Sequence, residues 1–305
     1  MEFIRFTRKN IIINLLLVSL YFAWAFFLGG LRTDQMILIM LYVICFYAHQ
    51  KTRKFILGFS IFIVFWIAYD SMRALPNYEV STVHIREPYE LEKALFGIHK
   101  NGSVLIPSEY FANHTSQILD LLSGLFYINW MPVPLAFGVY LFVKDKYMFT
   151  KFSLVFLLAN LVGFVIYYIY PAAPPWYVEL HGFSLKIGVP GFRAGLGRFD
   201  ELVGIPVFAG IYNKNANVLA AMPSLHSAYP VIVLYYGIKK RLGLFIIFLV
   251  IFMIGIWFSA VYTSHHYIID IVVGVADALI AIFSFEKLSH IRLVDNWLIS
   301  FKNKI

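Results

Sequence analysis

The chain has 305 residues, of which 60% are hydrophobic, 18% are aromatic and 14% are charged, and its formal net charge is +8. Soluble domains are about half apolar and about a quarter charged, so this composition excludes an ordinary soluble domain and indicates a polytopic membrane protein. The positive charge does not require a nucleic-acid partner, because the cytoplasmic loops of membrane proteins collect Lys and Arg. Cys45 is the sole cysteine, which excludes an intrachain disulfide and a cysteine metal site.

The first apolar run follows a basic N-terminal arm, an arrangement that signal peptides share. Ala23 and Ala25 resemble a cleavage motif, but the run continues to Leu31 and is long enough to span a bilayer. We therefore expect a first membrane helix that is retained.

Further apolar runs, bounded by charged or turn residues, predict an all-α polytopic membrane helix bundle of about eight transmembrane helices. The predicted spans are 11–30, 35–48, 54–71, 122–143, 152–170, 223–238, 243–262 and 266–285. The second and the sixth spans are short for a hydrocarbon layer about 30 Å thick. Two longer polar segments, 73–120 and 171–222, interrupt the series and are expected to lie outside the membrane.

The basic residues between the spans are unevenly distributed. The turns that are rich in Lys and Arg are 49–53, 144–151 and 239–242, together with the two ends of the chain. The short turns on the other side of the predicted membrane, 31–34 and 263–265, contain only one basic residue of the Lys and Arg type, Arg32. Because cytoplasmic turns carry the excess of basic residues, we expect both termini in the cytoplasm and the two long loops on the extracytoplasmic face.

Two histidines lie where predicted spans begin, His226 in "AMPSLHSAYP" and His266 in "YTSHHYIID". Both spans run inward from the same face, so both histidines are expected at the extracytoplasmic surface. Each lies near a helix N-terminus, where free N–H groups and the helix dipole favour an anion. Ser224 is a plausible N-cap for the first of these helices.

Asp270 follows His266 by four residues, a spacing that places both on one face of a helix. A carboxylate there accepts a hydrogen bond from one ring nitrogen and leaves the other nitrogen as a nucleophile. His226 is positioned to protonate the departing oxygen as a general acid. These three residues predict phosphoryl transfer through a phosphohistidine intermediate.

These motifs resemble those of a known family. "PSLHS" resembles the P-S-G-H motif of the type 2 phosphatidic acid phosphatase superfamily, and Ser259 to Asp270 resembles its S-R-x5-H-x3-D motif. "YPAAPPWY" (170–177), "AGLGRFDELVG" (194–204), "AMPSLHSAYP" and "YTSHHYIIDIVVG" follow the order and spacing of its lipid phosphotransferase branch, the inositol phosphorylceramide synthases. The resemblance spans roughly residues 110–285.

The resemblance implies a six-helix phosphatase-like core, with His266 as nucleophile, Asp270 as its partner and His226 as acid. It also implies that no metal or other cofactor takes part. The first two spans carry no recognisable motif. We therefore expect two accessory helices in 1–50, a six-helix catalytic membrane domain in 51–290, and a cytoplasmic tail in 291–305.

The chain departs from the superfamily in its cations. The first motif, K-x6-R-P, aligns with Gly163, Tyr170 and Pro171, and Ala260 stands where the third motif has arginine. A phosphodiester transition state still needs positive charge or hydrogen-bond donors around its oxygens. We expect the loop 171–222 to supply them, and the candidate substrate-binding residues are Arg198, Arg193, Ser224, Trp176 and Asp200.

Several residues allow a structural interpretation instead. Trp176 is also suited to anchor the membrane interface, and Arg198 with Asp200 to form an exposed loop ion pair. His265 is expected to point away from Asp270 and to have a structural role. Asp277, an intramembrane carboxylate, is suited either to function or to a buried pairing role.

A zinc site is an alternative interpretation of part of this cluster. Its ligands would be His226, His265, His266 and Asp270, since zinc accepts His and Asp. Adjacent histidines on a helix diverge, however, and the resemblance implies a reaction without metal.

Three functions remain open from the sequence. The leading one is a lipid phosphotransferase that moves a headgroup phosphate, with phosphoinositol as the favoured group, from a phospholipid donor to a ceramide-like or other lipid alcohol. The second is a lipid phosphatase or pyrophosphatase in which water is the acceptor. The third is a non-enzymatic channel or transporter. The sequence does not determine the oligomeric state.

Overall fold

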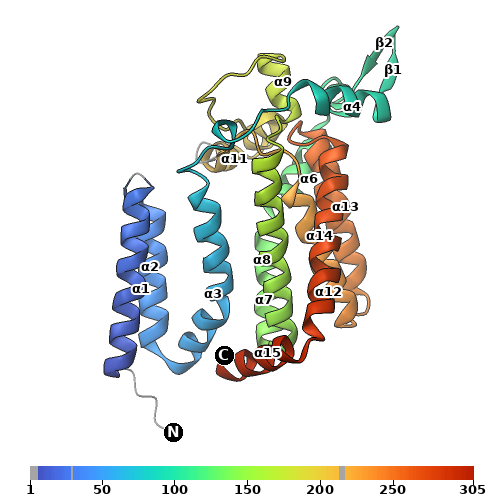
Figure 1. The fold of residues 1–305 in the computed structure, drawn as a ribbon. Coiled ribbons are helices and arrows are strands. Elements are labelled where there is room, and N and C mark those ends of the chain that lie inside the picture. Colours follow the sequence, from blue (N-terminus) through green and yellow to red (C-terminus); the bar gives the residue numbers. More distant parts are fainter. Residues whose placement is uncertain (1–5, 29, 213–216) are drawn as a thin grey trace.

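The computed structural model describes residues 6–28, 30–212 and 217–305, and Figure 1 shows a bundle of long helices capped at one end by a layer of short elements. The bundle helices are α1 (Arg8–Phe27), α2 (Thr33–Ala48), α3 (Gln50–Ser71), α6 (Gln117–Ile128), α7 (Pro132–Lys144), α8 (Lys146–Ile169), α12 (Leu225–Lys239), α13 (Phe245–Tyr262) and α14 (Ile268–Ser289). The start of α1 and the C-terminal helix α15 (Arg292–Lys304) lie at the end opposite the cap.

Every predicted span contains a helix, and the prediction of an all-α polytopic membrane protein is confirmed. Within the described residues, five helices are long and apolar enough to cross a membrane: α1, α3, α8, α13 and α14. The predicted span 122–143 is not one straight helix, because α6 and α7 meet at an angle of 43° near Pro132 and form a sixth candidate only as a pair. At 16 and 15 residues, α2 and α12 are shorter, so the count of eight crossings stays a prediction.

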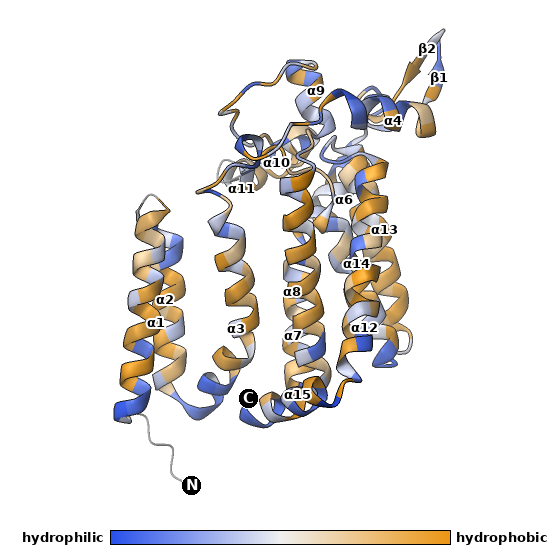
Figure 2. Ribbon diagram, in the orientation of Figure 1, coloured by the Kyte–Doolittle hydropathy of each residue, from blue (hydrophilic) through white to orange (hydrophobic). Residues whose placement is uncertain are grey.

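The long helices expose apolar side chains to their surroundings. In α1, for example, Leu15 is 61%, Leu20 66% and Phe26 76% exposed. Figure 2 shows hydrophobic residues along the middle of the helices, with hydrophilic residues concentrated at their ends and in the cap. An exposed apolar surface of this extent is stable in lipid rather than in water, so the protein is integral to a membrane.

The core of the bundle is built around α8. This helix packs against α3, α7, α12 and α14, and its inward face consists of aromatic and small residues. Phe149 and Phe152 are fully buried, and Phe156 is 1% exposed. Their edge-to-face and tilted contacts with Phe142, Phe137 and Tyr229 are geometries that aromatic rings prefer.

A buried carboxylate ties α2 to α3. Asp70, near the end of α3, is 1% exposed and accepts hydrogen bonds from Arg32 at 2.6 Å, from Gln35 at 2.7 Å and from Arg73 at 2.9 Å. Trp24 of α1 donates to Ser71 at 3.1 Å. The first two helices are therefore held against α3 by polar contacts at the capped end of the bundle.

The cap consists of the two long loops, which are partly folded. The first contains a 3-10 turn (Asn77–Glu79), α4 (Arg86–Phe96), the hairpin β1 (Ile98–Lys100) and β2 (Ser103–Leu105), and α5 (Pro107–Ala112). The second contains α9 (Pro175–His181), a 3-10 turn (Ala194–Leu196), α10 (Gly197–Val203) and α11 (Val207–Tyr212). Isolated parallel bridges join His84 to Ala172 and Ala172 to Ala220, so the two loops form one layer.

The C-terminal segment 291–305, predicted as a tail, is largely the helix α15. It runs across the end of the bundle opposite the cap (Figure 1). Leu298 is fully buried, and Tyr147 of α8 donates a hydrogen bond to Asp295 at 2.8 Å. These contacts fix α15 against the base of α8.

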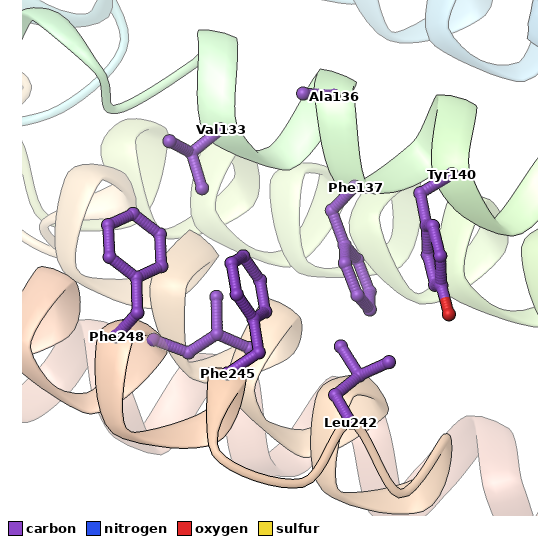
Figure 3. Close-up of a pocket in the computed structure, with 8 residues that line it drawn as sticks. Val133, Ala136, Phe137, Tyr140, Leu242, Phe245 and Phe248 are labelled. Carbon is purple, nitrogen blue, oxygen red and sulfur yellow. The ribbon is translucent and has the colours of Figure 1, made fainter.

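A cavity of about 430 Å³ lies between α7 and the start of α13. Figure 3 shows its lining: Val133, Ala136, Phe137, Tyr140, Leu242, Phe245 and Phe248 are labelled, and Leu249 completes it. Apart from the phenol of Tyr140, the lining offers no group that titrates or attacks. This cavity is an apolar groove in the membrane-facing part of the bundle, and its lining does not contain the predicted catalytic residues.

Candidate active site

His226 and His266 come together where α12 and α14 begin, in the bundle just below the cap. His226 Nδ1 lies 3.3 Å from His266 Nε2, and His266 Nδ1 lies 3.4 Å from Asp270 Oδ2. His266 and Asp270 are 6% and 0% exposed, whereas His226 is partly exposed. The three residues that the sequence predicted as a catalytic set therefore form one continuous chain of contacts.

Close packing of α12 against α14 produces this arrangement. A Cβ atom at Gly274 would collide with the backbone carbonyl of Ser224, so glycine is needed where the two helices approach. The backbone N–H of Ser224 donates to the carbonyl of Asp270 at 3.0 Å. Ser224 is the N-cap of α12, and its hydroxyl accepts from the N–H of Ser227 at 3.4 Å, which confirms it as a helix cap.

The hydrogen-bond pattern determines which nitrogens carry protons. Asp270 Oδ2 already accepts the N–H of Tyr267 at 2.9 Å, so it acts as an acceptor for His266 Nδ1–H as well. His266 Nε2 then has a lone pair, and a proton on His226 Nδ1 makes the contact at 3.3 Å a hydrogen bond; Tyr127 Oη lies 3.4 Å from the same Nδ1. The lone pair of a nucleophile thus faces the proton of an acid.

His266 precedes the helix rather than lying on it. The helix α14 begins at Ile268 with Tyr267 as N-cap, so the contact between His266 and Asp270 joins a connecting segment to the first helical turn. The four-residue spacing predicted the contact between His266 and Asp270, although the backbone at His266 is not helical. Burial lowers the pKa of His266 from 6.5 to about 4, and the Ala221 backbone has a smaller effect in the opposite direction. The lowered pKa keeps the ring neutral at pH 7.

Glu92 is a residue of this site that the sequence did not reveal. It lies on α4, is 1% exposed, and accepts the N–H of Ile268 at 2.9 Å and that of Ile269 at 3.2 Å. Asp270 in turn accepts the N–H of Tyr267. The first N–H groups of α14 are therefore hydrogen-bonded to carboxylates of the protein itself. The expectation that this helix N-terminus is free for an anionic substrate is wrong. No local sequence pattern links Glu92 to a helix 176 residues away.

A small cavity of about 80 Å³ opens onto the histidines. Its lining is aromatic and polar and comes from the bundle and the second loop: Tyr127, Tyr167, Pro174, Trp176, Tyr212, Asn217, Val218, Ala220, Ala221, His226, His265 and His266. Trp176 is 4% exposed, and its backbone N–H donates to the carbonyl of Ser264 at 3.0 Å. Trp176 thus lies in the cavity wall, where it is too buried to be a membrane-interface anchor.

Arg198 lies beside this cavity but is not part of its lining. Its Nε donates to Asp120 at 2.6 Å, and Tyr262 donates to the same carboxylate oxygen at 2.8 Å. Gly195 lies between the Thr263 backbone and the Arg198 guanidinium, and a Cβ on this glycine would collide with both. Glycine at this position therefore lets the guanidinium lie close to Thr263. Among the described residues Nη2 has no hydrogen-bond partner, so one donor of Arg198 remains open near the histidine segment.

Asp200 has a different partner from the one predicted. It is 4% exposed and pairs with Arg193 at 3.2 Å, while also accepting the N–H groups of Phe208 at 2.9 Å and Ala209 at 3.0 Å. The alternative of an exposed ion pair between Arg198 and Asp200 is therefore wrong. Arg193 and Asp200 join α10 to α11, and neither lines the cavity.

His265 is not directed away from the site, contrary to expectation. It is 4% exposed and lines the same cavity as His226 and His266. It follows the end of α13 in a connecting segment, where Ser264 has φ of 61°. Because Ser264 has this left-handed backbone conformation, both His265 and His266 face the cavity. If the segment were a continuous helix, the two adjacent side chains would diverge.

The remaining polar groups do not assemble a metal site. Within the described ranges, no group of three or more His, Cys, Asp or Glu side chains is arranged to hold a metal ion. The zinc alternative therefore lacks a ligand set in this part of the chain. Asp277 lies deeper in α14, is 2% exposed, and neither carboxylate oxygen has a hydrogen-bond partner among the described residues.

The fold is that of an integral membrane protein, and the two histidines and Asp270 at one end of its bundle are suited to phosphoryl transfer. Residues 102–284 match the family model of the PAP2 superfamily. A phosphoinositol dihydroceramide synthase of Bacteroides thetaiotaomicron is 43% identical over 282 residues, 92% of each chain. The chain belongs to the PAP2 superfamily, and it is a lipid phosphotransferase.

Fungal relatives match over a smaller share of their length. An inositol phosphorylceramide synthase of Candida albicans is 27% identical over 259 residues, 83% of this chain and 52% of the relative. The catalytic subunit of the Saccharomyces cerevisiae inositol phosphorylceramide synthase is 30% identical over 197 residues, 62% of this chain and 47% of the relative. No solved structure matches the chain.

Proposed function

We propose that the protein transfers phosphoinositol from a phosphatidylinositol-like donor to the primary hydroxyl of a dihydroceramide- or ceramide-like lipid. The observation that carries the chemistry is the contact of 3.3 Å between His226 Nδ1 and His266 Nε2, with Asp270 behind His266. The choice of lipids is supported by the name of the Bacteroides thetaiotaomicron relative, which is 43% identical over 92% of each chain.

In the first half-reaction, His266 Nε2 attacks the phosphorus atom and the bond from phosphorus to the diacylglycerol oxygen breaks. His226 Nδ1 gives its proton to that oxygen, so diacylglycerol leaves as a neutral alcohol. Asp270 stabilises the ring of His266 as it acquires positive charge. The phosphoryl group binds between the two nitrogens, so the rings move apart when substrate enters.

In the second half-reaction, the acceptor hydroxyl gives its proton to His226 Nδ1 and its oxygen attacks phosphorus. The bond from phosphorus to His266 Nε2 breaks, and the enzyme returns to its starting protonation state. Arg198 is our preferred clamp for the phosphoryl oxygens because Nη2 is open beside the histidine segment. Arg193, Ser224, Trp176 and Asp200 remain candidates for shaping the substrate site, and Trp176 among them lines the cavity.

We place this site at the extracytoplasmic face, with both termini in the cytoplasm. The distribution of basic turns supports this orientation, and the start of α1 and α15 lie at the same end (Figure 1). We further propose that 51–290 is the catalytic membrane domain and that 1–50 is an accessory pair of helices.

The test is a lipid-product measurement on the purified protein in mixed micelles. With phosphatidylinositol and dihydroceramide present, mass spectrometry should detect a phosphoinositol-bearing sphingolipid and diacylglycerol in equal amounts. His266→Ala is the matched negative control. Free inositol phosphate in place of the sphingolipid product would support the phosphatase alternative, and no turnover of any lipid would contradict both.

A further inference from the structure

The site contains a third histidine that the phosphotransfer steps above do not use. His265 Nδ1 lies 3.1 Å from the carbonyl of Thr263 and 3.0 Å from the hydroxyl of Thr263. That hydroxyl donates its own proton to the carbonyl of Ser259 at 2.7 Å, so it too can only accept from His265. Two acceptors therefore face Nδ1, which must carry the proton.

This determines the character of the other ring nitrogen. Burial, followed by the neighbouring His266 and His226, lowers the pKa of His265 well below its ordinary value, and weaker polar contacts with the Thr263 and Phe192 backbones oppose this effect. The ring is therefore neutral at pH 7. A neutral imidazole that is protonated on Nδ1 has a lone pair on Nε2, so Nε2 is a hydrogen-bond acceptor.

The acceptor nitrogen of His265 is buried and vacant. Within the described ranges Nε2 has no hydrogen-bond partner, and the ring lines the cavity with His226 and His266. An unpaired polar atom in a buried position has a free-energy cost, because it has lost its hydrogen bonds to water. A phosphoryl oxygen does not relieve this cost, because it is itself an acceptor. A hydroxyl group does, because it donates.

We propose that His265 Nε2 accepts a hydrogen bond from a substrate hydroxyl group beside the reacting phosphorus, and so acts as a specificity-determining residue. This inference rests on the proposed function, which supplies two sources of such a hydroxyl. One source is the secondary hydroxyl of the dihydroceramide acceptor, because its primary hydroxyl gives its single proton to His226. The other is the polyol headgroup of the donor.

Two substitutions separate this role from a structural one. The side-chain amide of His265→Asn reaches the position of Nδ1 and retains a donor toward Thr263, but it has no acceptor at the position of Nε2. The longer side chain of His265→Gln places an amide oxygen near the position of Nε2. If the only role of His265 is its hydrogen bonding to Thr263, the asparagine variant retains activity. If it binds a hydroxyl, the glutamine variant retains more.

The experiment measures diacylglycerol release and sphingolipid formation separately, with purified wild type and both variants in micelles of phosphatidylinositol and dihydroceramide. We expect His265→Asn to lose at least tenfold in transfer and His265→Gln to recover a clear part of it. An acceptor hydroxyl is indicated if the asparagine variant releases the first equivalent of diacylglycerol as fast as wild type but has a higher KM for dihydroceramide. A headgroup hydroxyl is indicated if release of this first equivalent slows and the KM for phosphatidylinositol rises.

The proposal is overturned if His265→Asn equals wild type, or if the glutamine variant is no better than the asparagine variant. A wild-type protein that forms no sphingolipid product would instead contradict the proposed function. The circular dichroism and detergent-extraction yield of both variants check that they fold. If a variant has altered folding, the test is instead a titration of the wild type with acceptors that lack the secondary hydroxyl. Wild type that binds such an acceptor as well as dihydroceramide, by competition in the donor-release assay, would also overturn the acceptor form of the proposal.

Discussion

The carboxylate of Glu92 on α4 accepts the backbone N–H of Ile268, the first residue of α14, at 2.9 Å. This hydrogen bond joins the first extramembrane loop to the helix that follows the proposed nucleophile. Burial raises the pKa of Glu92 from 4.5 to about 7, although its hydrogen bonds to Ile268 and Ile269 act in the opposite direction. The burial of Glu92 therefore couples the stability of the protein to pH.

A pH-dependent stability follows from Glu92. Between pH 4.5 and about 7 the folded protein holds a proton on this group that the unfolded chain has released. The contribution of Glu92 to the free energy of unfolding is therefore fully present below pH 4.5 and is lost as pH rises through about 7. We expect Glu92→Gln to flatten the change in Tm between pH 5 and pH 8, measured by thermal unfolding in detergent. An identical pH profile for variant and wild type would contradict the assignment.

Loss of the nucleophile or of its partner should abolish turnover without unfolding the protein. We expect His266→Ala and Asp270→Ala each to reduce the rate of phosphoinositol transfer by several orders of magnitude, because the covalent step requires both. Labelled phosphoinositol should remain bound to wild type after rapid quenching at alkaline pH and should be absent from His266→Ala. Near-normal activity of His266→Ala would refute the phosphohistidine mechanism.

The open donor of Arg198 predicts sensitivity to a substitution that keeps its charge. A guanidinium binds two phosphoryl oxygens in a planar fork, which an ammonium group does not reproduce. We expect Arg198→Lys to lower kcat about tenfold or more, equivalent to about 1.4 kcal/mol. Arg193→Lys is the matched control and should have a smaller effect, because Arg193 is paired with Asp200 away from the cavity. Wild-type turnover in both Arg198→Lys and Arg198→Ala would remove Arg198 from the site.

The proposed orientation is open to cysteine labelling in a Cys45→Ala background. Ser264 is a poor reporter because it is 6% exposed. Ser103 in the hairpin and Lys144 at the end of α7 are both exposed. We expect Ser103→Cys to react with an impermeant thiol reagent in intact cells, and Lys144→Cys to react only after permeabilisation. The reverse pattern would place the site on the cytoplasmic face.

Activity should survive chelation. The proposed nucleophile, acid and clamp are all side chains, and none of their assigned steps requires an ion. We expect EDTA dialysis to leave the transfer rate unchanged. Loss of activity that one divalent metal restores would favour the zinc alternative.

The sequence predicted the helices and the grouping of His226, His266 and Asp270 because both depend on local patterns. Apolar run length indicates a membrane helix, and His226, His266 and Asp270 lie in short polar motifs where α12 and α14 begin. The bend between α6 and α7 was missed, because both helices are apolar and hydropathy does not register the break near Pro132.

The contacts made by the loops were not predictable from local sequence. Asp120 pairs with Arg198 across 78 residues, and Glu92 reaches Ile268 across 176. His265 was misplaced for a different reason. A helical projection was applied to a connecting segment in which Ser264 has a left-handed backbone conformation.

The cavity beside His226 and His266 lies where the bundle meets its cap, so a lipid can present its headgroup there while its chains stay among neighbouring lipids. The enzyme then encounters its substrates by lateral diffusion in two dimensions. The quantity that sets its rate is the mole fraction of each lipid in the surface, rather than its molarity in the sample. Adding inert detergent at constant lipid and protein concentration should therefore slow the reaction by surface dilution. Because the two proposed half-reactions occur one after the other, diluting both lipids together below saturation should slow the reaction in proportion to their mole fraction.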